Sequence, residues 1–168
     1  MPTIGVAVPV PEPWGEQLRR QRAGFGDPAA QTVPTHVTLL PPQETDADEL
    51  DGVYARLAEA AADHEPYRIH LRGTGTFRPI SPVVFVAVAE GISPTELLAK
   101  SIRTALLRGD LEFPYHPHVT VAHHLDDAGL DHAFDALADF ECTFDVNAFS
   151  LYLHDEDDGW ITHREFAL

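Results

Sequence analysis

Two copies of one tripeptide, His-Val-Thr, are the residues of this sequence best suited to chemistry. They stand at residues 36–38 and 118–120, which is 118 − 36 = 82 positions apart. On a β-strand the side chains at i and i+2 point the same way, so each histidine shares a face with its threonine. A pair of imidazoles, with an ordinary pKa of about 6.5, can supply a general acid and a general base. Threonine hydroxyls can donate to phosphate oxygens. The set therefore predicts proton transfer at phosphorus.

The two motifs have matching settings. Pro34 precedes the first motif, Pro41-Pro42 follows it, and Pro117 lies directly before the second. Apolar residues follow both threonines. A lone histidine on a strand is most often a surface or hydrogen-bonded residue. Two copies in matching settings indicate a functional pair instead.

The segments around the motifs predict strands and helices in alternation. Apolar β-rich runs bounded by proline or glycine indicate strands, and apolar residues at i, i+3, i+4 and i+7 indicate amphipathic helices. In the first half we predict strands at Thr3–Val10, Thr35–Leu40, Tyr67–Phe77 and Val83–Ala89, and helices at Trp14–Arg22, Glu44–His64 and Ser93–Arg108. Thr45 and Asp48 resemble a capping box at the start of the second helix.

The second half repeats the order of elements that runs from residue 35 to residue 89. A strand at Pro114–Val121 is followed by an acidic helix near Leu130, then by strands at Cys142–Leu153 and Trp160–Leu168. This order points to an internal duplication. We therefore expect an α+β fold of two similar lobes that pack face to face around a shared central cleft. The lobes would form a single domain over residues 1–168, each contributing one motif.

Composition and charge limit the partners. With 11 Lys and Arg against 27 Asp and Glu, the formal charge is −16. Long nucleic acid is disfavoured because non-specific binding to it depends on Lys and Arg, whereas a small phosphate-bearing ligand remains compatible. No apolar stretch approaches the roughly 20 residues of a membrane span, and no basic signal segment follows Met1. The single cysteine, Cys142, cannot form an internal disulfide, which fits a reducing compartment. We expect a cytoplasmic monomer that contacts no membrane.

The chain resembles the two-histidine phosphoesterase superfamily, and within it the bacterial 2'-5' RNA ligase and RNA 2',3'-cyclic phosphodiesterase branch. The resemblance rests on the segments Pro34-Thr35-His36-Val37-Thr38-Leu39-Leu40-Pro41-Pro42 and Tyr115-His116-Pro117-His118-Val119-Thr120-Val121-Ala122. It implies a bilobal α+β fold over nearly the whole chain, in which two intertwined lobes of antiparallel sheet and helices are related by a pseudo-twofold axis. It also implies metal-independent hydrolysis of a 2',3'-cyclic phosphate to a 2'-phosphate, with reversible 2'-5' ligation in some members, and no cofactor.

The resemblance also implies roles for the motif residues. Carried over by position, His36 and His118 would be the acid and the base, and Thr38 and Thr120 would hold the phosphate. We expect His118 to activate water and His36 to protonate the departing 3' oxygen, although the sequence leaves the reverse assignment open. The expected partner is a small nucleotide or a short RNA end that carries a cyclic phosphate.

Three further residues are candidate substrate contacts. Arg78, in a Pro-rich turn after a strand, could bind phosphate or ribose, but such an arginine is more often solvated. Phe77 and Tyr115 could stack on a base, as aromatic side chains do in single-stranded RNA sites. They are equally well explained as core residues.

Two alternative interpretations stay open. His116, His123 and His124 raise the question of a zinc site with His118, but no cysteine is near and no recognised ligand spacing occurs, so we expect no metal. The other alternative is a non-catalytic module that binds nucleotides or RNA ends on the same duplicated fold. Turnover of a cyclic nucleotide would separate this alternative from an enzyme.

Overall fold

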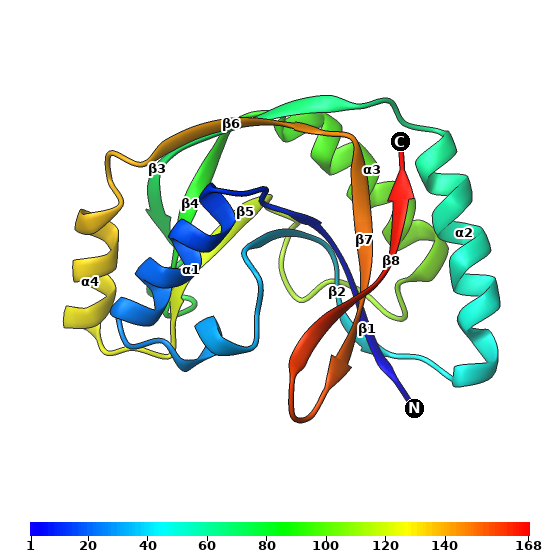
Figure 1. The fold of residues 1–168 in the computed structure, drawn as a ribbon, viewed down its shortest axis with the longest axis horizontal. Helices are drawn as coiled ribbons and strands as arrows, with labels where there is room; N and C mark the ends of the chain where they lie inside the picture. Colours follow the sequence, from blue (N-terminus) through cyan, green and yellow to red (C-terminus); the bar gives the residue numbers. More distant parts are fainter.

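Two four-stranded antiparallel sheets form the centre of the protein, and the computed structural model describes all of residues 1–168 (Figure 1). The first sheet has the order β2-β1-β7-β8, made of β2 (His36–Glu44), β1 (Thr3–Pro9), β7 (Ala148–Asp155) and β8 (Gly159–Ala167). The second has the order β5-β4-β3-β6, made of β5 (His118–His123), β4 (Val83–Glu90), β3 (Tyr67–Thr76) and β6 (Glu141–Val146). Each motif therefore begins an edge strand, β2 in one sheet and β5 in the other.

Four α-helices cover the sheets. They are α1 (Trp14–Gly24), α2 (Leu50–Ala62), α3 (Ile92–Leu106) and α4 (Asp127–Ala136), with short 3-10 turns at Pro28–Gln31 and Ala47–Glu49. Helices α2 and α3 pack against each other and against the first sheet, through β8 and β2 respectively. Helices α1 and α4 pack against the second sheet, where both contact β5 (Figure 1). Buried apolar side chains from both sheets and all four helices form one continuous core.

The internal duplication is a strand-helix-strand-helix unit. The first copy is β1-α1-β2-α2 and the second is β4-α3-β5-α4. In each sheet the two strands of a unit are antiparallel neighbours, with the motif strand outside. The α+β class and the duplicated lobes are confirmed. Aligning residues 35–89 with the second half, as the predicted order of elements suggests, would equate β4 with β8. In the structure β4 instead corresponds to β1, so the repeat begins one strand and one helix earlier, at β1.

The prolines after the first motif do not end its strand. Strand β2 continues through Pro41 and Pro42 to Glu44, and its register against β1 shifts between Ile4 and Val6. Proline is tolerated on an edge strand and at a bulge because no ladder hydrogen bond is required there. The predicted strand end at Leu40 is therefore wrong.

The predicted helix Glu44–His64 is also too long. The strand takes up its first residue, a 3-10 turn follows, and α2 runs only from Leu50 to Ala62. The expected capping box of Thr45 and Asp48 does not form, because Thr45 is buried and its backbone N–H donates to the Pro2 carbonyl.

Two predicted strands of the second half need correction. The strand expected at Pro114–Val121 starts only at His118, because Pro114 and Pro117 have no N–H to give to a ladder. The strand expected at Cys142–Leu153 is two strands, β6 and β7, separated at Asn147. Val146 pairs with β3 in one sheet and Ala148 pairs with β8 in the other, so the chain crosses between the sheets at this point.

Gly159, at the start of β8, is a position where we expect a methyl group to be costly. Its φ is +76°, and an added Cβ would lie 2.4 Å from the Thr32 carbonyl oxygen. Gly159→Ala should therefore lower the free energy of unfolding by about 1–3 kcal/mol. Gly52 in α2 is the matched control, because nothing lies within 4 Å of an added Cβ there. Gly52→Ala should stabilise the protein by about 0.5–1 kcal/mol. Urea unfolding of the two variants checks both signs, and equal effects would contradict the packing described at residue 32.

Candidate active site

The two motifs occupy equivalent places in the two sheets. His36 pairs with Pro9 and Thr38 with Ala7 on β1, while His118 pairs with Ala87 and Thr120 with Phe85 on β4. The valine between each pair is fully buried in the core. Because side chains alternate along a strand, His36 and Thr38 lie on the opposite face from Val37, and the second motif behaves the same way. Strands β2 and β5 contact each other, so the two motifs come together at the junction of the sheets.

Both motif histidines have the same tautomer. His36 Nδ1 donates to the Pro34 carbonyl and His118 Nδ1 donates to the His116 carbonyl, each at 2.6 Å. A carbonyl oxygen only accepts, so the proton of each neutral ring is on Nδ1, and Nε2 is the unprotonated, basic nitrogen. The Thr38 hydroxyl lies 3.1 Å from His36 Nε2 and donates to it. Each ring is thus oriented by the backbone two residues before it, with Nε2 available for proton transfer.

Burial lowers the pKa of both motif histidines below the ordinary value of 6.5. The hydrogen bond to a backbone carbonyl opposes this shift in each case. Positive charge adds to it: Arg22 lowers the pKa of His36, and His116 and His36 lower that of His118. In the free protein both imidazoles are therefore neutral at neutral pH, and an anion between them would make protonation of one ring more favourable.

Aromatic rings surround His118. The Phe77 ring lies edge-on to it with centroids 4.9 Å apart, and Phe85 follows at 5.4 Å. The ring of His116 is exposed and lies 6.0 Å from that of His118. Phe77 was a candidate base-stacking residue, and the structure places it directly against His118. Phe85 and His116 are neighbours of the site that the sequence argument did not select.

A cavity of about 200 Å³ opens beside His36 and Thr38. Its other lining residues come mainly from β1, β2, β7 and β8, and they are Gly5, Val6, Ala7, Val33, Pro34, Leu40, Pro42, Tyr152 and Trp160. The Trp160 ring comes within 3.3 Å of the place a Cβ would occupy on Gly5. Sequence reasoning missed Trp160 and Tyr152. Both residues lie on the strands predicted between residues 142 and 168, but nothing in the sequence showed that β7 pairs with β1.

The remaining two candidate contacts have other partners. Arg78 Nη1 forms ion pairs with Asp131 at 2.9 Å and Asp127 at 3.6 Å, and its Nε donates to Thr76 Oγ1. The Tyr115 hydroxyl donates to the Thr38 carbonyl at 2.6 Å, and its ring lies beneath the Arg103 guanidinium. Arg78 is thus bound by α4, while Tyr115 connects the loop before β5 to β2.

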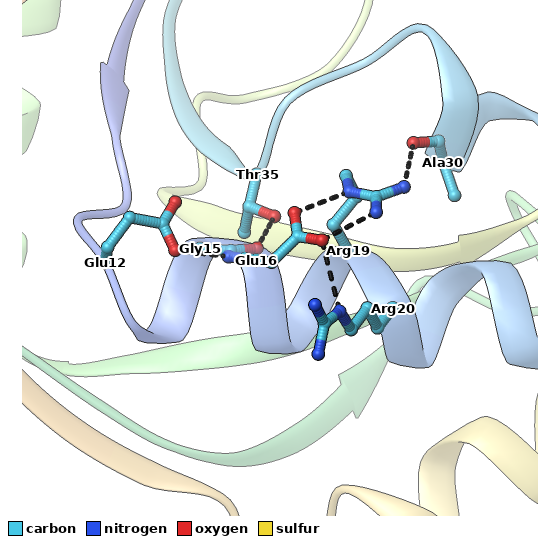
Figure 2. Close-up of polar contacts among 7 residues, drawn as sticks. All are labelled: Glu12, Gly15, Glu16, Arg19, Arg20, Ala30 and Thr35. Atoms are coloured by element: carbon cyan, nitrogen blue, oxygen red, sulfur yellow. Dashed lines mark hydrogen bonds and ion pairs between the residues drawn. The ribbon is translucent and has the colours of Figure 1, made fainter.

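Polar contacts of α1 anchor the segment that leads into His36, as Figure 2 shows. Thr35 Oγ1 donates to the Gly15 carbonyl at 2.7 Å, and Arg19 Nη1 donates to the Ala30 carbonyl at 3.5 Å. Glu16 holds Arg19 through two hydrogen bonds of 2.7 Å (Figure 2). Helix α1 thereby holds the segment from Ala30 to Thr35 that leads into the motif.

A buried ion pair anchors the same region to the other sheet. Arg22 Nε, on a side chain only 10% exposed, donates to Asp27 Oδ2 at 2.7 Å. Asp27 also accepts from the backbone N–H groups of Ala29 and His123. Because His123 ends β5, this carboxylate joins α1 of the first unit to the motif strand of the second.

The histidine-rich stretch does not assemble a metal site. The rings of His123 and His124 stack at 3.8 Å, but no three His, Cys, Asp or Glu side chains of the protein are grouped to hold a metal ion. His116 lies before β5 rather than on it, so it does not share a strand face with His118 as a continuous strand would require.

Two solved structures have a fold similar to that of this protein. LigT of E. coli in complex with 3'-AMP matches with a TM-score of 0.75 and 19% identity, covering 100% of this chain and 99% of that one. The protein TT0787 of Thermus thermophilus matches with a TM-score of 0.69 and 25% identity, covering 100% of this chain and 98% of that one. Both matches extend over the whole chain, so this protein has the same fold as LigT and TT0787.

The sequence comparisons identify the family. A family model described as the 2'-5' RNA ligase superfamily matches residues 9–158. The protein therefore belongs to the 2'-5' RNA ligase superfamily, which confirms the resemblance seen in its motifs. A Bacillus anthracis protein named "Putative phosphoesterase" is 29% identical over 147 residues, covering 84% of this chain and 83% of that protein. Family and relative together support a phosphoesterase. None of the helices has the length and apolar character needed to cross a membrane.

The Arg22–Asp27 pair gives a test of how the site is held together. Asp27→Asn leaves the buried guanidinium without its carboxylate, so the free energy of unfolding should fall by about 3–5 kcal/mol. Asp145→Asn is the control, because the Arg68–Asp145 pair has side chains 61% and 64% exposed. Its removal should cost less than about 1 kcal/mol. Denaturant unfolding measures both, and a similar small cost for the two would contradict the anchoring role of Asp27.

Proposed function

We propose that the protein hydrolyses the 2',3'-cyclic phosphate of a nucleotide or short RNA end to a 2'-phosphate without a metal ion. The observation that carries this proposal is the pair of equivalent His-x-Thr motifs, each with its histidine held in the Nδ1-protonated tautomer. Two basic Nε2 atoms and two threonine hydroxyls at one sheet junction suit attack of water on phosphorus. The family match supports phosphoesterase chemistry.

The proposed reaction uses the two histidines in turn. His118 Nε2 removes a proton from water as the water oxygen bonds to phosphorus, and the bond from phosphorus to the 3' oxygen breaks. His36, protonated at Nε2, gives its proton to the departing 3' oxygen, which leaves the 2'-phosphate product. Thr38 and Thr120 donate to the non-bridging oxygens. The 2'-5' ligation found in the family would be the related transfer with a 5' hydroxyl in place of water.

The cavity beside His36 is the proposed place for the nucleoside. Trp160 and Tyr152 give it an aromatic wall, and its volume of about 200 Å³ suits one small group rather than a folded strand. Phe77 offers a second aromatic surface beside His118. The formal charge of −16 favours a mononucleotide or short oligonucleotide over long RNA.

Turnover of 2',3'-cyclic AMP in the presence of EDTA is the direct test of the proposal. The wild-type protein should form 2'-AMP, and His36→Ala and His118→Ala should each reduce kcat/KM by about 10²-fold or more, the usual scale for loss of a general acid or base. Thr104→Ala, on an exposed position of α3, is the control and should leave the rate unchanged. Product analysis by chromatography measures the outcome.

Two results would contradict the proposal. Full activity in either histidine variant removes the acid and base mechanism, and saturable binding without product identifies a non-catalytic binding module. A phosphodiester with a p-nitrophenolate leaving group, which needs no proton, separates the two roles. His36→Ala should lose little activity on it, while His118→Ala should remain impaired.

The pH dependence follows from the lowered pKa values. The base must be neutral and the acid protonated, so kcat/KM should be bell-shaped and report the free protein. Because the pKa of each histidine is below 6.5, the optimum should lie below pH 6.5 and the rate should fall as the pH rises further. The two limbs belong to the coupled pair rather than to single residues. An optimum above pH 8 would contradict burial of the pair.

A further inference from the structure

A second depression lies beside α3, outside the proposed catalytic cavity. Its volume is about 460 Å³, and it is lined by Ser93, Glu96, Leu97, Lys100, Arg103 and Tyr115. Five of the six come from α3, which packs against β2. Lys100 is the only lysine of the chain. In a protein of charge −16, this depression gathers two cations with only one acid.

Arg103 in this depression has an unmet hydrogen-bonding requirement. Its Nη1 is buried and has no hydrogen-bond partner. The guanidinium carbon lies 4.6 Å from the centre of the Tyr115 ring, so one face of the group is covered by an aromatic surface. A buried guanidinium N–H without an acceptor is costly, and an oxyanion is the partner that best removes the cost.

The internal duplication shows what such an arginine requires. Arg22 lies on α1, 36 − 22 = 14 positions before the first motif histidine, and Arg103 lies on α3, 118 − 103 = 15 positions before the second. Each helix joins the two strands of its own unit and contacts the motif strand of the other unit. In the first unit the guanidinium is bound by the Asp27 carboxylate. In the second unit the protein supplies no such anion to Arg103 Nη1.

We propose that the depression formed by Ser93, Lys100, Arg103 and Tyr115 is an oxyanion site that binds a phosphate group, separate from the cavity at the two histidines. The bound phosphate would accept hydrogen bonds from the Arg103 guanidinium, as the Asp27 carboxylate accepts one from Arg22 Nε. Arg103 supplies directed N–H donors, and Lys100 supplies a second charge at the exposed rim. The Ser93 hydroxyl adds a neutral donor.

Two features set the properties of this site. Glu96 lines the depression as well, so the affinity should be moderate and should rise when this carboxylate is removed. Tyr115 forms one wall and donates to the Thr38 carbonyl, so the site borders the strand that carries the first motif. The phosphate could be a free anion or the next phosphate of an RNA strand whose end lies in the catalytic cavity. The second source rests on the proposed function, whereas binding of the anion itself does not.

Titration of the full protein with inorganic phosphate, followed by backbone amide shifts in NMR, tests the site by position. Phosphate should shift amides of α3 between residues 93 and 103, apart from any shifts at residues 36–38 and 118–120. Arg103→Gln should weaken the α3 response about tenfold, the scale of one charge-assisted hydrogen bond. Lys100→Gln should weaken it less, and Glu96→Gln should strengthen it. Arg72→Gln, which removes an exposed arginine of β3, is the charge-matched control and should change nothing.

Kinetics then distinguish the two sources of phosphate. If the ligand is part of the substrate strand, Arg103→Gln raises KM for a trinucleotide with a cyclic phosphate end but not for 2',3'-cyclic AMP. If it is a free anion, the two KM values stay unchanged while the NMR response is lost. The proposal is overturned if phosphate leaves α3 unshifted, or if Arg103→Gln and Lys100→Gln both behave like Arg72→Gln. Because the NMR result needs no turnover, it stands apart from the outcome of the cyclic phosphodiesterase test.

Discussion

Alternation of side chains on two edge strands determines where this protein can do chemistry. Val37 and Leu39 on β2, and Val119 and Val121 on β5, are buried at 0–1% exposure. Slipping either strand by one residue would expose these side chains and bury the polar set. The hydrophobic energy of the core therefore holds the histidines and threonines on the opposite face. Contact between β2 and β5 then brings the two sets to one junction, and a backbone carbonyl orients each ring.

The arginines near the two motifs differ in whether the protein itself supplies a carboxylate to bind them. Arg22 and Arg78, two of the ten arginines, are neutralised by carboxylates of the protein. No Lys or Arg lines the cavity beside His36 and Thr38, so proton transfer by imidazole with hydroxyl donation is the chemistry its side chains provide. Burial lowers the pKa of both imidazoles, which favours their neutral form at neutral pH. Arg103 differs from Arg22 and Arg78, because one of its buried nitrogens has no acceptor.

Local sequence patterns predict much of the fold and of the candidate site. The remaining features depend on strand pairing between distant parts of the chain. The repeated tripeptide and its proline settings predicted the family, the α+β class and the duplicated lobes, because strand periodicity is a local property. Strand ends were less predictable: Pro41 and Pro42 are tolerated only because β2 is an edge strand, which the sequence does not show. The division at Asn147 and the pairing of β7 with β1 also depend on contacts far apart in the chain. For that reason the sequence does not indicate Trp160 and Tyr152 as site residues, and it suggests Arg78 as a substrate contact although α4 binds this side chain. The roles of His36, His118, Thr38 and Thr120 remain predictions.

The central claim is that the two motif imidazoles face one shared space and influence each other's protonation. An NMR titration of the His118 ring in the wild-type protein and in His36→Gln measures this most directly. The pKa of His118 should lie below 6.5 in the wild type and should rise in the variant, because the introduced glutamine cannot become positively charged in the acidic range where the two histidines titrate. Its Nδ1 should carry the proton of the neutral ring in both. An unchanged pKa of His118 in His36→Gln would contradict the account, since it would place the two motifs in separate environments.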